Sequence, residues 1–217
     1  MSMKTLIISG GKINETFAVP FIKSLLPDYT VGVDHGLEFC ARNNIRPDYI
    51  VGDFDSLAQN ILTEYQTTDI PIRTFNPIKD ATDTCIALEY AIEKKSTEIW
   101  ILGATGTRFD HMLCNLQTLK KAYNARIPAY IVDEHNLISL PIDHHFTIRK
   151  EEQFGEYVSF FPLEEEVTEL TLKGFFYPLD RHTLRGIDGL GVSNRIIDDI
   201  AEVSYLGGTL VMMQTKD

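Results

Sequence analysis

The chain has 217 residues and a formal net charge of −11, with 44% hydrophobic and 24% charged residues. This composition excludes disordered and fibrous classes, and the acidic balance argues against a nucleic-acid partner or an anionic membrane surface. Three widely spaced cysteines without a CxxC pair, and no apolar run long enough for a signal peptide or a membrane span, indicate a cytoplasmic protein.

Residues 1–135 alternate short apolar runs with segments of helical periodicity. The expected strands are 5–9, 29–33, 49–51, 70–75, 98–102 and 129–132. The expected helices are 17–26, 37–43, 57–65, 80–95 and 109–123, with Asp80 as the N-cap of the fourth. This alternation predicts an α/β domain with a mostly parallel sheet that is flanked by helices on both faces.

Residues 136–217 show a different pattern, with short β-rich runs separated by glycine, proline and charged turns. The expected strands are 138–140, 146–149, 157–161, 169–172, 202–205 and 209–214. They predict a smaller all-β domain, an antiparallel sandwich or barrel. Leu-Gly-Gly-Thr at 206–209 predicts a tight hairpin between the last two strands.

Two carboxylates follow the third strand, in Gly-Asp-Phe-Asp-Ser at 52–56. Alternate side chains of an extended chain share a face, so Asp53 and Asp55 point the same way. At a separation of about 4 Å and an effective dielectric near 20, they repel by roughly 4 kcal/mol. A metal ion, a basic side chain, a proton or water has to offset this repulsion. A solvated turn that caps the next helix is an equally good interpretation of these residues alone.

Further acids open the helix expected at 80–95, in Lys79-Asp80-Ala-Thr-Asp83. Asp80 and Asp83 are three residues apart, so they share a helical face. A purely structural role is available to them, because acids in a first turn complement the helix dipole.

The loop after the fifth strand reads Gly-Ala-Thr-Gly-Thr-Arg-Phe-Asp-His at 103–111. Its small residues, Gly103, Thr105 and Gly106, let backbone N–H groups approach a phosphate at a helix start. A plain strand-to-helix turn is the alternative. Arg108 can bind a phosphate in a bidentate way, and Lys79 can do so as a point charge.

All three motifs fall at the carboxyl ends of strands, where open parallel sheets bind ligands. Clustered carboxylates repel a polyanion unless a metal lies between them. Magnesium takes oxygen ligands from one or two carboxylates together with substrate phosphates. The combination therefore predicts a Mg²⁺-nucleotide site.

In the order and spacing of these motifs the chain resembles the thiamine pyrophosphokinase family over nearly its whole length. The second domain adds Ser-Phe-Phe-Pro-Leu at 159–163, Gly-Phe-Phe-Tyr-Pro-Leu at 174–179 and Ser-Asn at 193–194. Two residues depart from the family pattern, which often has glycine at both positions: His35, in Val-Asp-His-Gly at 33–36, and Thr107.

The resemblance implies an enzyme that transfers pyrophosphate from ATP to the hydroxyethyl group of thiamine, giving thiamine diphosphate and AMP. It implies a catalytic ATP- and Mg²⁺-binding domain at 1–135 and a thiamine-binding and dimerisation domain at 136–217. A homodimer is implied, with the active site at the domain and subunit interface.

The resemblance also assigns roles to single residues. The implied magnesium ligands are Asp53, Asp55 and Asp83. The implied ATP-binding residues are Asp34, Lys79, Asp80, Gly103, Thr105, Gly106 and Arg108. The implied catalytic residues are Asp83, Asp110 and Arg108, with either aspartate as the base. The implied thiamine-binding residues are Tyr177, Ser193 and Asn194.

Two other functions fit the same fold: a non-catalytic sensor of nucleotide or thiamine, and another Mg²⁺-dependent phosphotransferase. A sensor does not need five aspartates at one sheet edge, so the residues favour the enzyme.

Overall fold

The computed structural model describes residues 2–54, 57, 59–74, 81–106 and 108–217. The chain divides into two compact units, Met1–Glu134 and His135–Asp217. No helix in the described ranges is long and apolar enough to cross a membrane.

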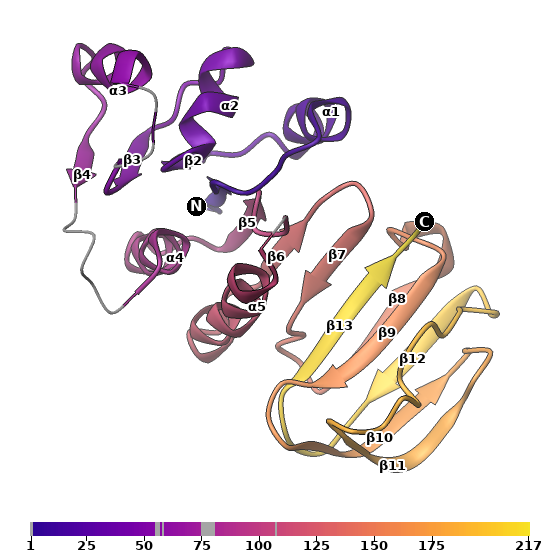
Figure 1. The fold of residues 1–217 in the computed structure, drawn as a ribbon. Coiled ribbons are helices and arrows are strands. Elements are labelled where there is room, and N and C mark those ends of the chain that lie inside the picture. The colour runs from indigo at the N-terminus through magenta and orange to yellow at the C-terminus, as the bar shows by residue number, and fades with distance from the viewer. Residues whose placement is uncertain (1, 55–56, 58, 75–80, 107) are drawn as a thin grey trace. The chain divides into compact units, whose positions relative to one another are not determined.

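The first unit is an α/β structure built around a parallel sheet (Figure 1). Its strands are β1 (Lys4–Ile8), β2 (Tyr29–Val33), β3 (Tyr49–Gly52), β4 (Ile72–Thr74), β5 (Glu98–Leu102) and β6 (Ala129–Val132). Its helices are α1 (Glu15–Leu25), α2 (Gly36–Arg42), α3 (Gln59–Gln66), α4 (Asp83–Glu93) and α5 (Phe109–Asn124). The strand order within the unit is β4-β3-β2-β1-β5-β6.

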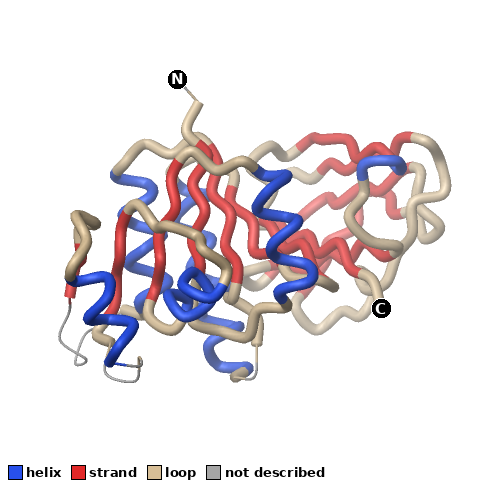
Figure 2. Tube along the Cα trace, turned by 90° about the horizontal axis from the view of Figure 1, so that it is seen from above, coloured by secondary structure: helices blue, strands red, loops and turns tan. Residues whose placement is uncertain are grey.

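Helices cover both faces of this sheet, as the apolar strands require. Figure 1 shows α1, α2 and α3 on one side of the strands and α4 and α5 on the other, and Figure 2 gives the same unit from above. Leu6, Ile7 and Ile8 of β1 are fully buried because both faces of a central parallel strand are covered. The predicted parallel sheet with helices is confirmed.

The start of α4 differs from the prediction. The helix begins at Asp83, and Thr82 is its N-cap, with the Thr82 side chain accepting a hydrogen bond from Cys85 N at 3.2 Å. The expectation that Asp80 caps this helix is therefore wrong. Asp80 itself lies outside the described residues, as do Asp55, Lys79 and Thr107.

The second unit contains two antiparallel sheets. Its strands are β7 (Asn136–Ser139), β8 (His145–Arg149), β9 (Tyr157–Pro162), β10 (Glu166–Lys173), β11 (Leu179–Arg185), β12 (Ile200–Ser204) and β13 (Leu210–Thr215). One sheet has the order β7-β13-β9 within the unit, and the other has the order β11-β10-β12-β8. A short 3-10 helix, η1 (Lys150–Glu152), follows β8.

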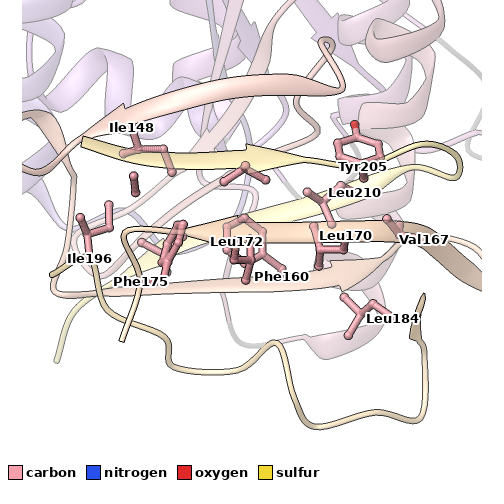
Figure 3. Packing of buried hydrophobic residues seen from close by; sticks show 13 residues of the cluster. Ile148, Phe160, Val167, Leu170, Leu172, Phe175, Leu184, Ile196, Tyr205 and Leu210 are labelled. Atoms are coloured by element: carbon pink, nitrogen blue, oxygen red, sulfur yellow. The ribbon is translucent and has the colours of Figure 1, made fainter. Parts of the chain in front are cut away.

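An apolar cluster fills the space between these sheets (Figure 3). It takes Phe160 from β9, Leu170 and Leu172 from β10 and Leu210 from β13, all with at most 1% of their surface exposed. The ring of Phe175 meets Phe160 edge-on, with centroids 5.7 Å apart. The predicted all-β antiparallel second part of the chain is confirmed.

One local prediction in this unit is wrong, and one strand was missed. Residues 206–209 do not close a hairpin, because β12 pairs with β8 and β10 whereas β13 pairs with β7 and β9. The turn carries the chain from one sheet to the other, and Gly208 adopts a φ of +90° there. Strand β11 was not predicted at all.

Candidate active site

The site lies where the strand order of the first unit reverses. β1 pairs in parallel with both β2 and β5. The chain proceeds from β1 through β2 and β3 to β4 on one side of β1, and then continues with β5 and β6 on the other side. Ligands of open α/β sheets bind outside the carboxyl ends of the strands at such a switch point. Here a cavity of about 840 Å³ is lined by the residues that follow β1, β2, β3 and β5 and by the first turns of α4 and α5.

Two glycine-containing loops form the floor of this cavity at the β1 and β5 ends. Gly11 N donates to Gly103 O at 2.9 Å, and Ser9 N donates to Leu102 O at 2.8 Å. A Cβ at Gly11 would lie 2.4 Å from Gly103 O and 2.7 Å from Thr105 O. The loops can therefore touch only because Gly11 has no side chain.

A side chain of α5 fixes the second loop. The buried Asn115 of α5 donates from Nδ2 to Ala104 O at 2.8 Å. Gly103 has a φ of +70°, and a Cβ there would lie 2.4 Å from Ser9 O. The structure thus brings the predicted phosphate-loop residues Gly103, Thr105 and Gly106 into the cavity wall in a defined conformation.

Three carboxylates line the same cavity: Asp34 after β2, Asp53 after β3 and Asp83 at the start of α4. The pKa of Asp34 is raised, first because the group is buried and also because the negative charges of Asp83 and Asp53 oppose its ionisation. One oxygen of this carboxyl group, Oδ1, is buried and has no hydrogen-bond partner among the described residues. Asp34 has a φ of +46°, which lies in the left-handed region that aspartate adopts more often than most other non-glycine residues.

The donor set suits a hard cation, although the described residues do not by themselves complete a metal site. Three carboxylates that line one cavity fit Mg²⁺, which prefers oxygen ligands. Within the described ranges, no three acidic, histidine or cysteine side chains are arranged to hold a metal ion. The predicted ligand Asp55 lies outside those ranges.

Arg108 and Asp110 form an ion pair at the start of α5. Arg108 Nε lies 3.1 Å from Asp110 Oδ1, and its second terminal nitrogen, Nη2, lies 2.6 Å from Oδ2. This pairing lowers the pKa of Asp110 to about 2. Arg108 and His111 line the cavity, whereas Asp110 does not. Asp110 therefore holds the guanidinium rather than facing the cavity itself.

The three predicted thiamine-binding residues come together in the second unit. Asn194 is 1% exposed, accepts a hydrogen bond from Tyr177 N at 2.9 Å and donates to Tyr177 O at 2.7 Å. Ser193 is exposed, with a φ of +55°. The Tyr177 ring is 56% exposed and meets Phe176 edge-on. Asn194 thus fixes the backbone beneath an exposed aromatic side chain.

Some residues of the cavity wall were not predicted, namely Ser9, Gly10 and Gly11 after β1 and Thr82 and Thr84 at α4. Ser9 Oγ and Thr84 Oγ1 form a hydrogen bond that joins the end of β1 to the first turn of α4. The sequence feature that could have indicated them is the Gly10-Gly11 pair, because it follows a predicted strand as the other site motifs do.

The fold and site together define a class: α/β proteins with a cavity between glycine-containing loops at a topological switch point, which is where open parallel sheets bind their ligands. Residues 26–131 match the family model described as thiamin pyrophosphokinase, catalytic domain, and residues 143–210 match its vitamin B1 binding domain. The chain belongs to the thiamin pyrophosphokinase family, whose enzymes pyrophosphorylate thiamine with ATP.

Full-length relatives support this membership. The chain is 33% identical to thiamine pyrophosphokinase of Bacillus subtilis (strain 168), covering 99% of this chain and 100% of the relative. The crystal structure of thiamine pyrophosphokinase from Bacillus subtilis superposes with a TM-score of 0.87 at 31% identity, covering 99% of each chain. The enzyme from Geobacillus thermodenitrificans gives 0.84 at 30% identity, covering 99% of this chain and 98% of the other. The family resemblance and the expected kinase activity are confirmed.

Proposed function

We propose that the cavity of the first unit binds ATP and that the pyrophosphoryl group passes there to the hydroxyethyl oxygen of thiamine. Attack on the β-phosphorus then releases AMP and forms thiamine diphosphate. The observation that carries this proposal is the meeting of two glycine loops and three carboxylates in one cavity at the β1/β5 switch point. Such a transfer depends mainly on positioning and on charge neutralisation, which this arrangement supplies.

The loop at Gly103, Thr105 and Gly106 is proposed to hold phosphate oxygens through backbone N–H groups, as helix-start loops do. Arg108 supplies the positive charge at the same helix start, and its ion pair with Asp110 presents the guanidinium at the cavity edge. Lys79 and Asp80 are proposed to join this binding site from the segment between β4 and α4.

Asp53 and Asp83, together with Asp55, are proposed to hold Mg²⁺. When bound, the ion would neutralise phosphate charge, which the carboxylates would otherwise repel. Of the two candidate bases, Asp83 lines the cavity, whereas Asp110 does not and its pKa is lowered to about 2. We therefore assign acceptance of the hydroxyl proton to Asp83 and positioning of Arg108 to Asp110.

Thiamine is proposed to contact Tyr177 and Ser193 in the second unit. An exposed aromatic face attracts the thiazolium cation by about 1–2 kcal/mol. Because the Asn194 amide already hydrogen-bonds both backbone groups of Tyr177, its role is positioning. We also propose that residues 136–217 form the dimerisation domain. The exposed side chains of Phe176, Leu190, Val192 and Ile197 support a homodimer, since such residues are common at interfaces.

Replacing Arg108 with alanine tests where ATP binds. A lost charge-assisted hydrogen bond costs about 1.5–3 kcal/mol, so the KM for ATP should rise by about 10–100-fold. The KM for thiamine should change little. Steady-state kinetics with each substrate varied in turn gives both values. Arg126→Ala, just beyond the other end of α5, is the matched control and should behave as the wild type. An unchanged KM for ATP in Arg108→Ala would contradict this location of the phosphates.

A further inference from the structure

Helix α4 and the turn after it are joined to β1 by two buried pairs of hydroxyl groups, one at each end of the strand. At the carboxyl end, Ser9 Oγ and Thr84 Oγ1 form a hydrogen bond, and both residues are buried in the cavity wall. At the amino end, Thr5 Oγ1 lies 2.7 Å from Ser96 Oγ, and this pair is buried as well. The two pairs have the same chemistry, but the first lines the cavity and the second lies at the opposite edge of the sheet.

Each member of the Ser9–Thr84 pair belongs to a segment that other hydrogen bonds already fix. Ser9 N donates to Leu102 O at 2.8 Å, which holds Ser9 against the end of β5. Thr84 lies in the first turn of α4, which Thr82 caps by accepting a hydrogen bond from Cys85 N at 3.2 Å. The hydroxyl pair therefore sets the position of this helical turn relative to the end of the sheet.

The functional side chain that depends on this connection is Asp83, which precedes Thr84 in the same turn and also lines the cavity. Successive side chains of an α-helix point about 100° apart, so fixing Thr84 against β1 also fixes the direction in which Asp83 leaves the helix. A carboxylate that accepts a proton or holds a cation acts only from the correct position, and a displacement of about 1 Å can lower a rate by about 10²-fold.

On the basis of the role proposed above for Asp83, we propose that the hydroxyl pair of Ser9 and Thr84 positions the Asp83 carboxylate for the reaction. Ser9 is then a positioning residue for catalysis, although it lies 75 positions before Thr84 in the sequence. Because it acts through Asp83, its contribution appears in kcat rather than in the KM for either substrate.

The test measures kcat and both KM values in variants of the full-length enzyme. Ser9→Ala and Thr84→Val each remove the hydrogen bond without adding bulk. Each should lower kcat by about tenfold, while the KM values for ATP and thiamine stay within about twofold of the wild type. Thr84→Ser keeps the hydroxyl group and should retain kcat to within about twofold.

The second hydroxyl pair provides the matched control. Thr5→Val makes the same substitution as Thr84→Val on the same strand and helix, and it also removes a buried hydrogen bond to a serine. It should therefore lower the midpoint of urea unfolding about as much as Thr84→Val does, yet keep the wild-type kcat. A loss of kcat in Thr5→Val equal to that in Thr84→Val would overturn the proposal, because lost stability would then explain both.

A double-mutant cycle with Asp83→Asn distinguishes positioning from direct contact with a substrate. If Ser9 acts through Asp83, adding Ser9→Ala to Asp83→Asn should lower kcat further by less than about twofold, as measured by single-turnover kinetics. A further loss of about tenfold in that background would overturn the proposal. A raised KM for ATP in Ser9→Ala would also overturn it, by assigning Ser9 to substrate binding.

The remaining outcomes separate this inference from the function on which it rests. Wild-type kcat in both Ser9→Ala and Thr84→Val, with kcat still lost in Asp83→Asn, would overturn the positioning role and leave the proposed function intact. Wild-type kcat in Asp83→Asn would contradict the proposed role of Asp83 itself, and this inference with it.

Discussion

Replacing Asp83 with asparagine is expected to lower kcat for thiamine diphosphate formation by about 10³-fold. Asp83 lines the cavity as the first residue of α4, and the Ser9–Thr84 hydrogen bond ties this turn to the end of β1. Asparagine has nearly the same shape but no negative charge. It can therefore neither balance a bound cation nor accept the hydroxyl proton.

The same substitution should leave the fold intact. An acid in a first helical turn contributes about 0.3–1 kcal/mol through the helix dipole, so the free energy of unfolding should fall by no more than that. Glu93→Gln, which removes an exposed acid from the last turn of α4, is the matched control and should retain full activity. Single-turnover kinetics and urea denaturation measure the two effects. A kcat within about threefold of the wild type would remove Asp83 from the chemistry.

Gly11→Ala is expected to lower kcat/KM by about 10²-fold, although position 11 carries no functional side chain. The added methyl group would lie 2.4 Å from Gly103 O and 2.7 Å from Thr105 O, and these are backbone atoms that no rotamer change can move away. The β1 and β5 loops must separate, which displaces the proposed phosphate-binding groups. Overpacking of this kind costs about 1–3 kcal/mol of stability.

The matched control for this substitution is Gly189→Ala in the second unit, where an added Cβ meets nothing within 4 Å. It should leave both the activity and the midpoint of urea unfolding unchanged. If Gly11→Ala kept wild-type kcat/KM, the contact between the two loops would have no role in placing the phosphates.

The first unit was predictable because its strands are apolar runs with clear ends. The expected strands 29–33, 98–102 and 129–132 coincide with β2, β5 and β6. The cap of α4 was not predictable in this way, because aspartate and threonine both make good N-caps and the segment 80–83 contains both types. Only the hydrogen bond from Cys85 N to the Thr82 side chain identifies Thr82 as the N-cap.

The second unit shows why local patterns are insufficient for β structure. Strand β11 reads Leu-Asp-Arg-His-Thr-Leu-Arg and buries only Leu184, so it lacks the apolar alternation that marks a strand. The Leu-Gly-Gly-Thr turn at 206–209 has hairpin chemistry, but sequence does not state that the strands before and after it belong to different sheets.

Within the candidate site, residues on recognisable motifs were predictable. The residues that hold those motifs in position were not. Asp53, Asp83, Gly103 and Arg108 were predicted to gather at one sheet edge, and all four line the cavity. Gly11 looks like an ordinary turn residue until β1 is known to lie beside β5, about 90 residues further along the chain. Asn194 was predicted to bind thiamine, but its hydrogen bonds with the backbone of Tyr177, 17 positions away, could not be read from the sequence.

Chromatography of adenine nucleotides and thiamine esters tests the pyrophosphoryl transfer most directly. The purified protein is incubated with thiamine, ATP and Mg²⁺, and parallel samples contain a chelator or the Asp83→Asn variant. We expect AMP and thiamine diphosphate in equal amounts from the wild type, neither product in the presence of the chelator, and both products at about a thousandth of the wild-type rate from the Asp83→Asn variant. ADP with thiamine monophosphate would show single phosphoryl transfer and contradict attack on the β-phosphorus, and thiamine binding without any turnover would identify a sensor instead of an enzyme.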